Sequence, residues 1–212
     1  MYLWITILVA GLYGHTRTLG PNHLSNNNVT HCQSTRLGGN PISKSVTSVL
    51  SNIDCQVIRL GLTDLKNHTN LSAPKNQTQI ILHEQTRSVP TQFMDRAWAI
   101  SLSRRDSEAK ANFRKRNSMV YQTKNLADNK LILVGNLLKP PSSFGSMDSL
   151  QEAFPRARIG VFSTIPGYSK SNRAAIIVFV FGPSSHGARA IYRMVRIGTK
   201  WKITARNIAY FA

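Results

Sequence analysis

Five basic side chains close to the end of the chain are the residues best suited to chemistry, and the chemistry they suit is anion binding. The set, which two tyrosines accompany, is Arg193, Arg196, Lys200, Lys202 and Arg206, with Tyr192 and Tyr210. Guanidinium and ammonium groups pair with phosphate, sulfate and carboxylate groups, and a cluster that neutralises several such charges binds with an affinity that falls steeply with salt. We predict a polyanion-binding site at the five basic residues.

The charge of the whole chain favours the same interpretation. Its 212 residues contain 27 Lys and Arg but only 9 Asp and Glu, which gives a formal net charge of +18. No acidic residue follows Glu152. A surface with this excess of positive charge attracts anionic partners without specificity. A role in solubility alone is the alternative interpretation of the charge.

Residues suited to catalysis are few. The C-terminal part of the chain has one histidine, His186, beside Ser185 in a stretch typical of a polar turn, and Asp148 and Glu152 are better explained as residues at the start of a helix. No P-loop, dinucleotide-binding, Gly-x-Ser-x-Gly or His-Glu-x-x-His motif is present. The six histidines and two cysteines lack the spacing of metal ligands. We therefore predict no catalytic residue, no metal and no cofactor.

The first 14 residues are predicted to be a secretory signal peptide. Residues 2–13 read YLWITILVAGLY, an uncharged and mostly apolar run that is shorter than the roughly 20 residues needed to span a bilayer. A buried N-terminal strand and an uncleaved anchor are the alternatives. With a signal peptide, the protein is expected to be secreted or to lie in the cell envelope. Its partner is then an anionic polymer or surface, such as a polysaccharide or lipid headgroups, rather than nucleic acid.

Export also bears on the oxidation state expected for the two cysteines. In an oxidising compartment, Cys32 and Cys55 are expected to form a disulfide. Such a bridge stabilises a fold by roughly 3 kcal/mol in the chain-entropy model. Two unlinked buried thiols are the alternative.

The composition changes near residue 90, which predicts two parts. Residues 15–90 are rich in Asn, Ser and Thr with short apolar interruptions, and we expect them to be a low-complexity, partly disordered region. Sequence that is not native coding sequence is the alternative explanation for this stretch. Residues 91–212 carry regular patterns and are predicted to be the folded domain.

Helical and strand patterns follow one another through this domain. Apolar residues at a spacing of four, beginning at Met94, Trp98 and Leu102 and continuing to Ala109 and Phe113, predict a helix. Its basic stretch, residues 104–116, is interpreted as a solvated face in preference to a phosphate-binding one. The other expected elements are a strand at 131–134, a helix at 147–154 with a capping box from Ser149 to Glu152, and strands at 159–165, 174–181, 189–197 and 200–211.

Alternation in the last strand divides it into two faces. The residues predicted to face a core are Trp201, Ile203, Ala205, Ala209 and Phe211, and those predicted to face solvent are Lys200, Lys202, Thr204 and Arg206. A tight turn at Gly198 and Thr199 joins this strand to the preceding one and makes an antiparallel meander. One side of the meander is therefore expected to be apolar and the other positive.

The order of helix, strand, short helix and closing meander, ending on Gly-Thr-Lys-Trp-Lys-Ile at residues 198–203, resembles the nuclear transport factor 2-like, or cystatin-like, cone fold. Over residues 91–212 the resemblance implies a curved antiparallel sheet wrapped by helices around a pocket. The family holds binding proteins, dimerisation modules and a minority of isomerases, dehydratases and cyclases. Those enzymes use a pocket-facing Asp with a His or Tyr partner, a set that has no match in this sequence.

The predicted class is therefore α+β, with helices packed on a curved antiparallel meander and a loosely ordered N-terminal half before it. The predicted function is that of an exported basic protein whose C-terminal domain binds an anionic or small ligand without catalysis. Two alternatives stay open: a pocket-based enzyme of isomerase or hydratase type on the same fold, and a nucleic-acid-binding protein. A homodimer is also left open.

Overall fold

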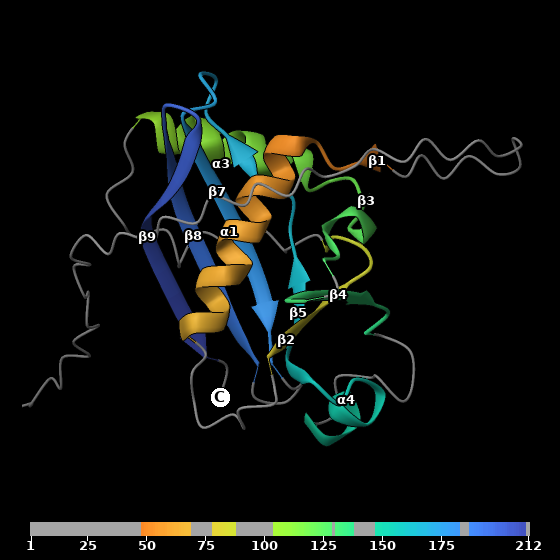
Figure 1. Cartoon of the computed structure of the whole chain (residues 1–212). Helices are drawn as coiled ribbons and strands as arrows, with labels where there is room; N and C mark the ends of the chain where they lie inside the picture. The colour runs from red at the N-terminus through yellow and green to blue at the C-terminus, as the bar shows by residue number, and fades with distance from the viewer. Residues whose placement is uncertain are drawn as a thin grey trace, which may run out of the picture. The chain divides into compact units, whose positions relative to one another are not determined.

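The computed structural model describes residues 48–68, 78–87, 104–128, 130–137, 147–182 and 187–210 (Figure 1). Within these ranges a seven-stranded sheet packs against helices, so the broad α+β prediction is confirmed. None of the helices in the described ranges is both long enough and apolar enough to cross a membrane.

The sheet is mixed rather than purely antiparallel. Six strands lie in the order β4–β2–β5–β7–β8–β9, and the seventh, β6, pairs with β7. Their bounds are β2 Gln79–His83, β4 Ile132–Gly135, β5 Ala157–Ser163, β6 Gly167–Tyr168, β7 Ala174–Phe181, β8 Ala188–Ile197 and β9 Lys200–Tyr210. β2 runs parallel to β4 and β5, whereas β5, β7, β8 and β9 follow one another antiparallel. The predicted antiparallel meander therefore corresponds to the half of the sheet that ends at β9, whereas the half that ends at β4 is parallel.

Helix α1, Asn52–His68, covers one face of the sheet. Its apolar side chains recur at helical spacing and are fully buried at Val57, Ile58, Leu62 and Leu65. They pack on buried residues of β2, β5, β7 and β8. The largest core of the molecule therefore lies between α1 and the sheet.

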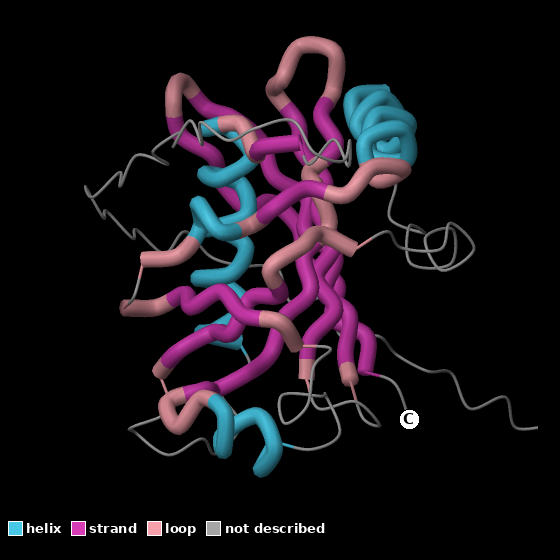
Figure 2. The backbone as a smooth tube through the Cα atoms, turned by 90° about the vertical axis from the view of Figure 1, so that its right-hand side faces the viewer, coloured by secondary structure: helices cyan, strands magenta, loops and turns pink. Residues whose placement is uncertain are grey.

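Helix α3, Arg104–Arg116, covers the opposite face. Its otherwise polar and basic sequence buries Ala109 and Phe113 against Ile176 and Val178 of β7. Figure 2 shows helices on both sides of the strands. This burial confirms that Ala109 and Phe113 lie on the apolar side of a helix. The expected start of that helix at Met94, Trp98 and Leu102 lies outside the described residues.

Smaller elements complete the fold. Helix α4, Met147–Ala153, packs on β2 and β5 through a separate apolar cluster. A two-stranded sheet joins β1, Ser48–Val49, to β3, Tyr121–Gln122, and a short 3-10 helix, η1, spans Lys124–Leu126.

Helix α1 and strand β2 correct the prediction that residues 15–90 are loosely ordered. Both belong to the main core, and all five residues of β2 are buried. Composition averaged over a long window hides a helix whose Asn, Thr and Lys residues face solvent, and the partners of β2 lie far along the chain in β4 and β5. Residues 15–47 and the predicted signal peptide at 1–14 lie outside the described residues.

Later elements follow the predictions closely. The expected strands at 131–134, 159–165, 174–181, 189–197 and 200–211 correspond to β4, β5, β7, β8 and β9. The capping box is wrong, because α4 begins at Met147 and Ser149 therefore lies inside the helix rather than before it. His186 lies outside the described residues.

A β-bulge in β9 corrects the predicted faces of that strand. The pairing runs Arg193 with Ala205 and then Met194 with Ile203, so Thr204 is an extra residue on β9. A bulge reverses the alternation beyond it. Trp201 and Ile203 do pack on the α1 side as predicted, but beyond the bulge Arg206 takes that side instead of Ala205.

Cys55 is buried on α1 and carries no free thiol. Its predicted partner, Cys32, lies outside the described residues, so the pairing remains a prediction.

Candidate anion-binding site

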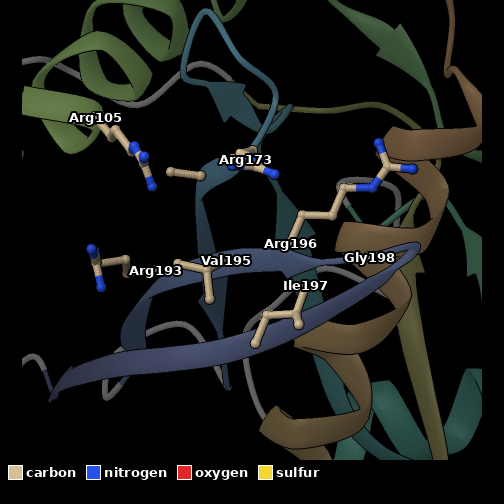
Figure 3. A pocket seen from close by; sticks show the side chains of 8 residues that line it. Arg105, Arg173, Arg193, Val195, Arg196, Ile197 and Gly198 are labelled. Carbon is tan, nitrogen blue, oxygen red and sulfur yellow. The ribbon is translucent and has the colours of Figure 1, made fainter.

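An arginine-lined hollow lies where the N-terminal end of α3 approaches β7 and β8 (Figure 3). Its volume is about 710 Å³. The described lining residues, which include four arginines and no acid, are Arg105, Arg173, Ala174, Arg193, Val195, Arg196, Ile197 and Gly198. We call this feature the arginine hollow.

Three segments bring the four arginines together. Arg105 stands in the first turn of α3, Arg173 directly precedes β7, and the other two belong to β8. The β7–β8 register pairs Ala174 with Val195, and the backbone N–H of Arg196 donates to the carbonyl of Arg173 at 2.9 Å. Antiparallel pairing therefore places residues 173 and 196 side by side although they are far apart in sequence.

Arg193 is the one hollow arginine that forms an ion pair with a described residue. Its Nε donates to Asp106 Oδ1 at 2.6 Å, and its NH1 donates to Thr204 Oγ1 at 3.0 Å. Asp106 is buried, whereas the side chain of Arg193 is 33% exposed. One side of this guanidinium is thus fixed in the protein while the group remains accessible.

The other arginines have no acidic partner within the described part of the chain. Arg105 and Arg173 are exposed, and no described side chain accepts a hydrogen bond from either. Arg196 extends toward α1 in Figure 3, away from the side chains of Arg105 and Arg193, and its Nε has no hydrogen-bond partner among the described residues. The hollow therefore presents unneutralised positive charge.

The five predicted anion-binding residues do not form one set. Arg193 and Arg196 line the hollow, and the register places Lys202 beside Val195 and Lys200 beside Ile197. Arg206 is separated from them, because its NH1 donates to Asp64 Oδ2 of α1 at 2.5 Å on the other face of the sheet. The bulge at Thr204 is the reason for this separation.

Sequence reasoning missed Arg105 and Arg173. Arg105 belongs to the basic stretch 104–116 that was interpreted as a solvated face, and Arg173 lies outside the predicted strand pattern. The β7–β8 register would have indicated Arg173, since it sits opposite Arg196. No local pattern indicates Arg105, because its approach depends on how α3 packs on the sheet.

A second cluster, at the C-terminal end of α3, contains an aspartate that is hydrogen-bonded to a tyrosine. Arg116 donates from NH1 to Asp54 Oδ1 at 2.8 Å and from NH2 to Asp54 Oδ2 at 2.9 Å, and it also donates to the carbonyl of Pro166. The Tyr168 hydroxyl donates to Asp54 Oδ1 at 2.9 Å. Ser51 donates to Oδ2 from both its backbone N–H and its hydroxyl. We call this cluster the Asp54 latch.

The latch is unsuited to proton transfer. Burial alone would raise the pKa of the Asp54 carboxyl, but the bonds from Arg116, Ser51 and Tyr168 outweigh it and lower that pKa. Burial, followed by the charge of Asp54, raises the pKa of the Tyr168 phenol. The carboxylate therefore stays ionised with its lone pairs occupied, and the phenol stays protonated. The cluster joins α1, α3 and β6 but offers no free base.

A buried histidine lies at the carboxyl ends of the parallel strands, where ligands of open α/β sheets often bind. His83, at the end of β2, accepts the Leu137 N–H at Nδ1 and packs on the ring of Phe162, with the centroids 4.7 Å apart. Burial lowers the pKa of this imidazole, so it is neutral near pH 7. Its role as an acceptor is structural, and no group of His, Cys, Asp and Glu among the described residues could hold a metal ion.

The comparisons with known proteins give no relative: no family model, no curated protein and no solved structure matches the chain.

Proposed function

We propose that this protein binds an anionic polymer through the arginine hollow and that it does so without catalysis. The observation that carries the proposal is that Arg105, Arg173 and Arg193, from three segments, line one hollow together with Arg196, and that no described residue of the lining is a carboxylate. Arginine offers rigid, paired N–H donors to phosphate, sulfate and carboxylate groups. A cluster that neutralises several of these charges gains affinity from the counterions it releases.

The lining favours a polymer over a small apolar ligand. Pockets for small molecules are mostly apolar with a few polar groups, whereas this hollow has an arginine rim and a small apolar floor formed by Ala174, Val195 and Ile197. None of the described residues that line it is aromatic, so it has no platform on which bases would stack. A polysaccharide or a headgroup surface therefore suits the hollow better than nucleic acid, and such a partner agrees with the proposed export of the protein.

The cone fold, with a sheet curved around a pocket, remains a hypothesis. The antiparallel succession of β7, β8 and β9 under α1 supports it. The enzyme alternative on that fold has no support from the Asp54 latch, because the carboxylate of Asp54 is already bonded to Arg116, Ser51 and Tyr168.

The test is the double variant Arg105→Gln with Arg173→Gln, measured by salt elution from immobilised heparin, a polysulfated polysaccharide. Both side chains are exposed and have no described partner, so the fold should survive. We expect earlier elution and a slope of log affinity against log salt that is shallower by about two, one for each lost contact, by analogy with phosphate contacts.

The matched control is Lys124→Gln with Lys130→Gln. These lysines are also exposed; Lys124 is the first residue of η1, and Lys130 lies just before β4, at the opposite edge of the sheet. The control removes the same net charge, so it should elute close to the unmodified protein. Equal losses in both double variants would mean that total charge, and not the hollow, binds heparin. Absence of salt-dependent retention in the unmodified protein would reject the proposal outright.

A further inference from the structure

Arg193 differs from the other hollow arginines because two side chains from separate elements hold it. Asp106 of α3 accepts from Nε, and Thr204, the extra residue of the β9 bulge, accepts from NH1. The Thr204 hydroxyl in turn donates to the carbonyl of Arg193 at 3.3 Å. The guanidinium is therefore fixed from two directions on the wall of the hollow.

The presence of Asp106 is informative because its charge opposes anion binding. A carboxylate within hydrogen-bond distance of a cationic site lowers the positive potential there. A hollow that only collected charge would therefore bind anions more tightly without Asp106. In a hollow that relies on a fixed donor, the affinity gained from orienting Arg193 exceeds the affinity lost through the lower potential. The reason is that a donor that is already ordered loses less conformational freedom when the ligand binds.

We propose, on the basis of the anion-binding function above, that the arginine hollow is a preorganised site for a sulfate or phosphate ester group, with Asp106 and Thr204 as positioning residues of Arg193. The bulge in β9 then has a function, since it brings Thr204 to the guanidinium of Arg193.

The number and direction of the donors point to an ester of a tetrahedral acid. A carboxylate has two oxygens in one plane and is matched by one arginine fork. A sulfate or phosphate ester has three terminal oxygens directed to different sides. Arg105, Arg173 and Arg193 approach the hollow from α3, from the turn before β7 and from β8, so their donors come from different directions. Arg193 has Nε committed to Asp106 and NH1 bonded to Thr204, so it offers its remaining N–H groups rather than a complete fork.

The decisive variant is Asp106→Asn, measured by titration with heparin at fixed salt. The substitution raises the net charge by one, and we nevertheless expect affinity to fall by about three- to tenfold. Asp148→Asn is the matched control, because it removes an exposed carboxylate from α4 and should leave affinity unchanged or slightly higher. Thr204→Val, at an exposed position and without any change of charge, should weaken binding by about threefold.

Arg193→Lys supplies an independent readout. It keeps the positive charge but has neither the planar fork nor an Nε donor, so positioning predicts a loss and simple charge predicts no change. If circular dichroism shows that Asp106→Asn does not fold, Thr204→Val and Arg193→Lys decide the question. Unchanged or tighter heparin binding by the folded variants would overturn the positioning role.

Ligand class is tested with three polymers: heparin for sulfate esters, a phosphoserine-rich polypeptide for phosphate esters and poly-glutamate for carboxylate. The two tetrahedral groups should bind at least about tenfold more tightly than poly-glutamate at equal concentration of charge, and their ratio identifies the preferred source. Equal binding of all three would overturn the ester preference. The proposed function fails separately, because it requires only that Arg105→Gln with Arg173→Gln weaken binding more than its lysine control.

Discussion

Near each of its ends, helix α3 contributes one member of an arginine–aspartate pair. The two pairs have opposite consequences. At its C-terminal end, Arg116 gives two N–H groups to Asp54 and a third to a backbone carbonyl, and its guanidinium lies over the ring of Tyr168. At its N-terminal end, Asp106 accepts a hydrogen bond from Nε of Arg193. Arg116 is therefore occupied by contacts within the fold, whereas Arg193 is oriented by its contacts and stays accessible.

The difference shows what makes an arginine available for binding. Side-chain exposure is 21% for Arg116 and 33% for Arg193, which is too small a contrast to explain their roles. The contrast lies in the surroundings, because Arg116 is enclosed by Asp54, Pro166 and Tyr168, whereas Arg193 adjoins two cations without partners. Disrupting one cluster should therefore change stability, and disrupting the other should change binding.

The largest expected effect is on stability, from Asp54→Ala. This change leaves Arg116 without its charge partner and removes the bonds from Ser51 to the carboxylate at the start of α1, so we expect a loss of about 3–5 kcal/mol in the free energy of unfolding, measured by urea denaturation. Asp148→Ala, at an exposed carboxylate of α4, is the control and should cost less than about 1 kcal/mol. A loss below about 1 kcal/mol for Asp54→Ala would contradict the assignment of the latch as structural.

A smaller effect is expected from Gly167→Ala, which connects the two regions. A Cβ at this position would collide with the backbone of α3 at Ala109 and Phe113. We expect a loss of about 1–3 kcal/mol from overpacking together with weaker heparin binding, because a shifted α3 moves Arg105 and Asp106.

Gly61→Ala is the matched control for that prediction. Its Cβ would press on the ring of Phe179 on the α1 side of the sheet and does not meet α3. It should lower stability but leave the heparin affinity of the folded protein unchanged. A loss of affinity in both variants would mean that binding follows global stability rather than the position of α3.

Features that depend on residues close together in sequence could be predicted, whereas features that depend on distant residues could not. The strands β7, β8 and β9 were predicted well because alternation and the Gly198–Thr199 turn are local signals. The place of helix α1 and strand β2 in the main core was missed because their burial depends on partners that follow much later in the chain.

The candidate site was reached only in part for the same reason. Arg193 and Arg196 were found from the strand pattern, while Arg105 required knowledge of how α3 crosses the sheet. Arg206 was assigned to the wrong face because alternation assumes a regular strand, and nothing in the sequence marks Thr204 as a bulge residue. Apart from Ser51, which lies three residues before Asp54, the Asp54 latch joins residues 62 and 114 positions apart, so no local motif could indicate the whole cluster.

Low pH should weaken the Asp54 latch, which is a further difference between it and the arginine hollow. Because the pKa of Asp54 is lowered by folding, the unfolded chain binds a proton at a higher pH than the folded one does. The stabilisation from Asp54 is therefore fully present above about pH 4, the ordinary range for aspartate, and is lost as the pH falls through the lower pKa of the folded state. The slope from this one group is at most about 1.4 kcal/mol per pH unit. Denaturation of the unmodified protein and of Asp54→Asn between pH 2 and pH 6 should show this extra slope only in the unmodified protein.

The smallest expected effect concerns the stability of Arg105→Gln with Arg173→Gln. Neither side chain has a partner among the described residues, so their loss should change the free energy of unfolding by less than about 0.5 kcal/mol. The sign is informative, because cations that surround one hollow repel each other and their removal should stabilise the fold slightly at low salt. At 1 M salt the Debye length is about 3 Å, so the gain should vanish. A clear loss of stability at both salt concentrations would show that these arginines are engaged in the fold, as Arg116 is, and would remove the distinction between the hollow and the latch.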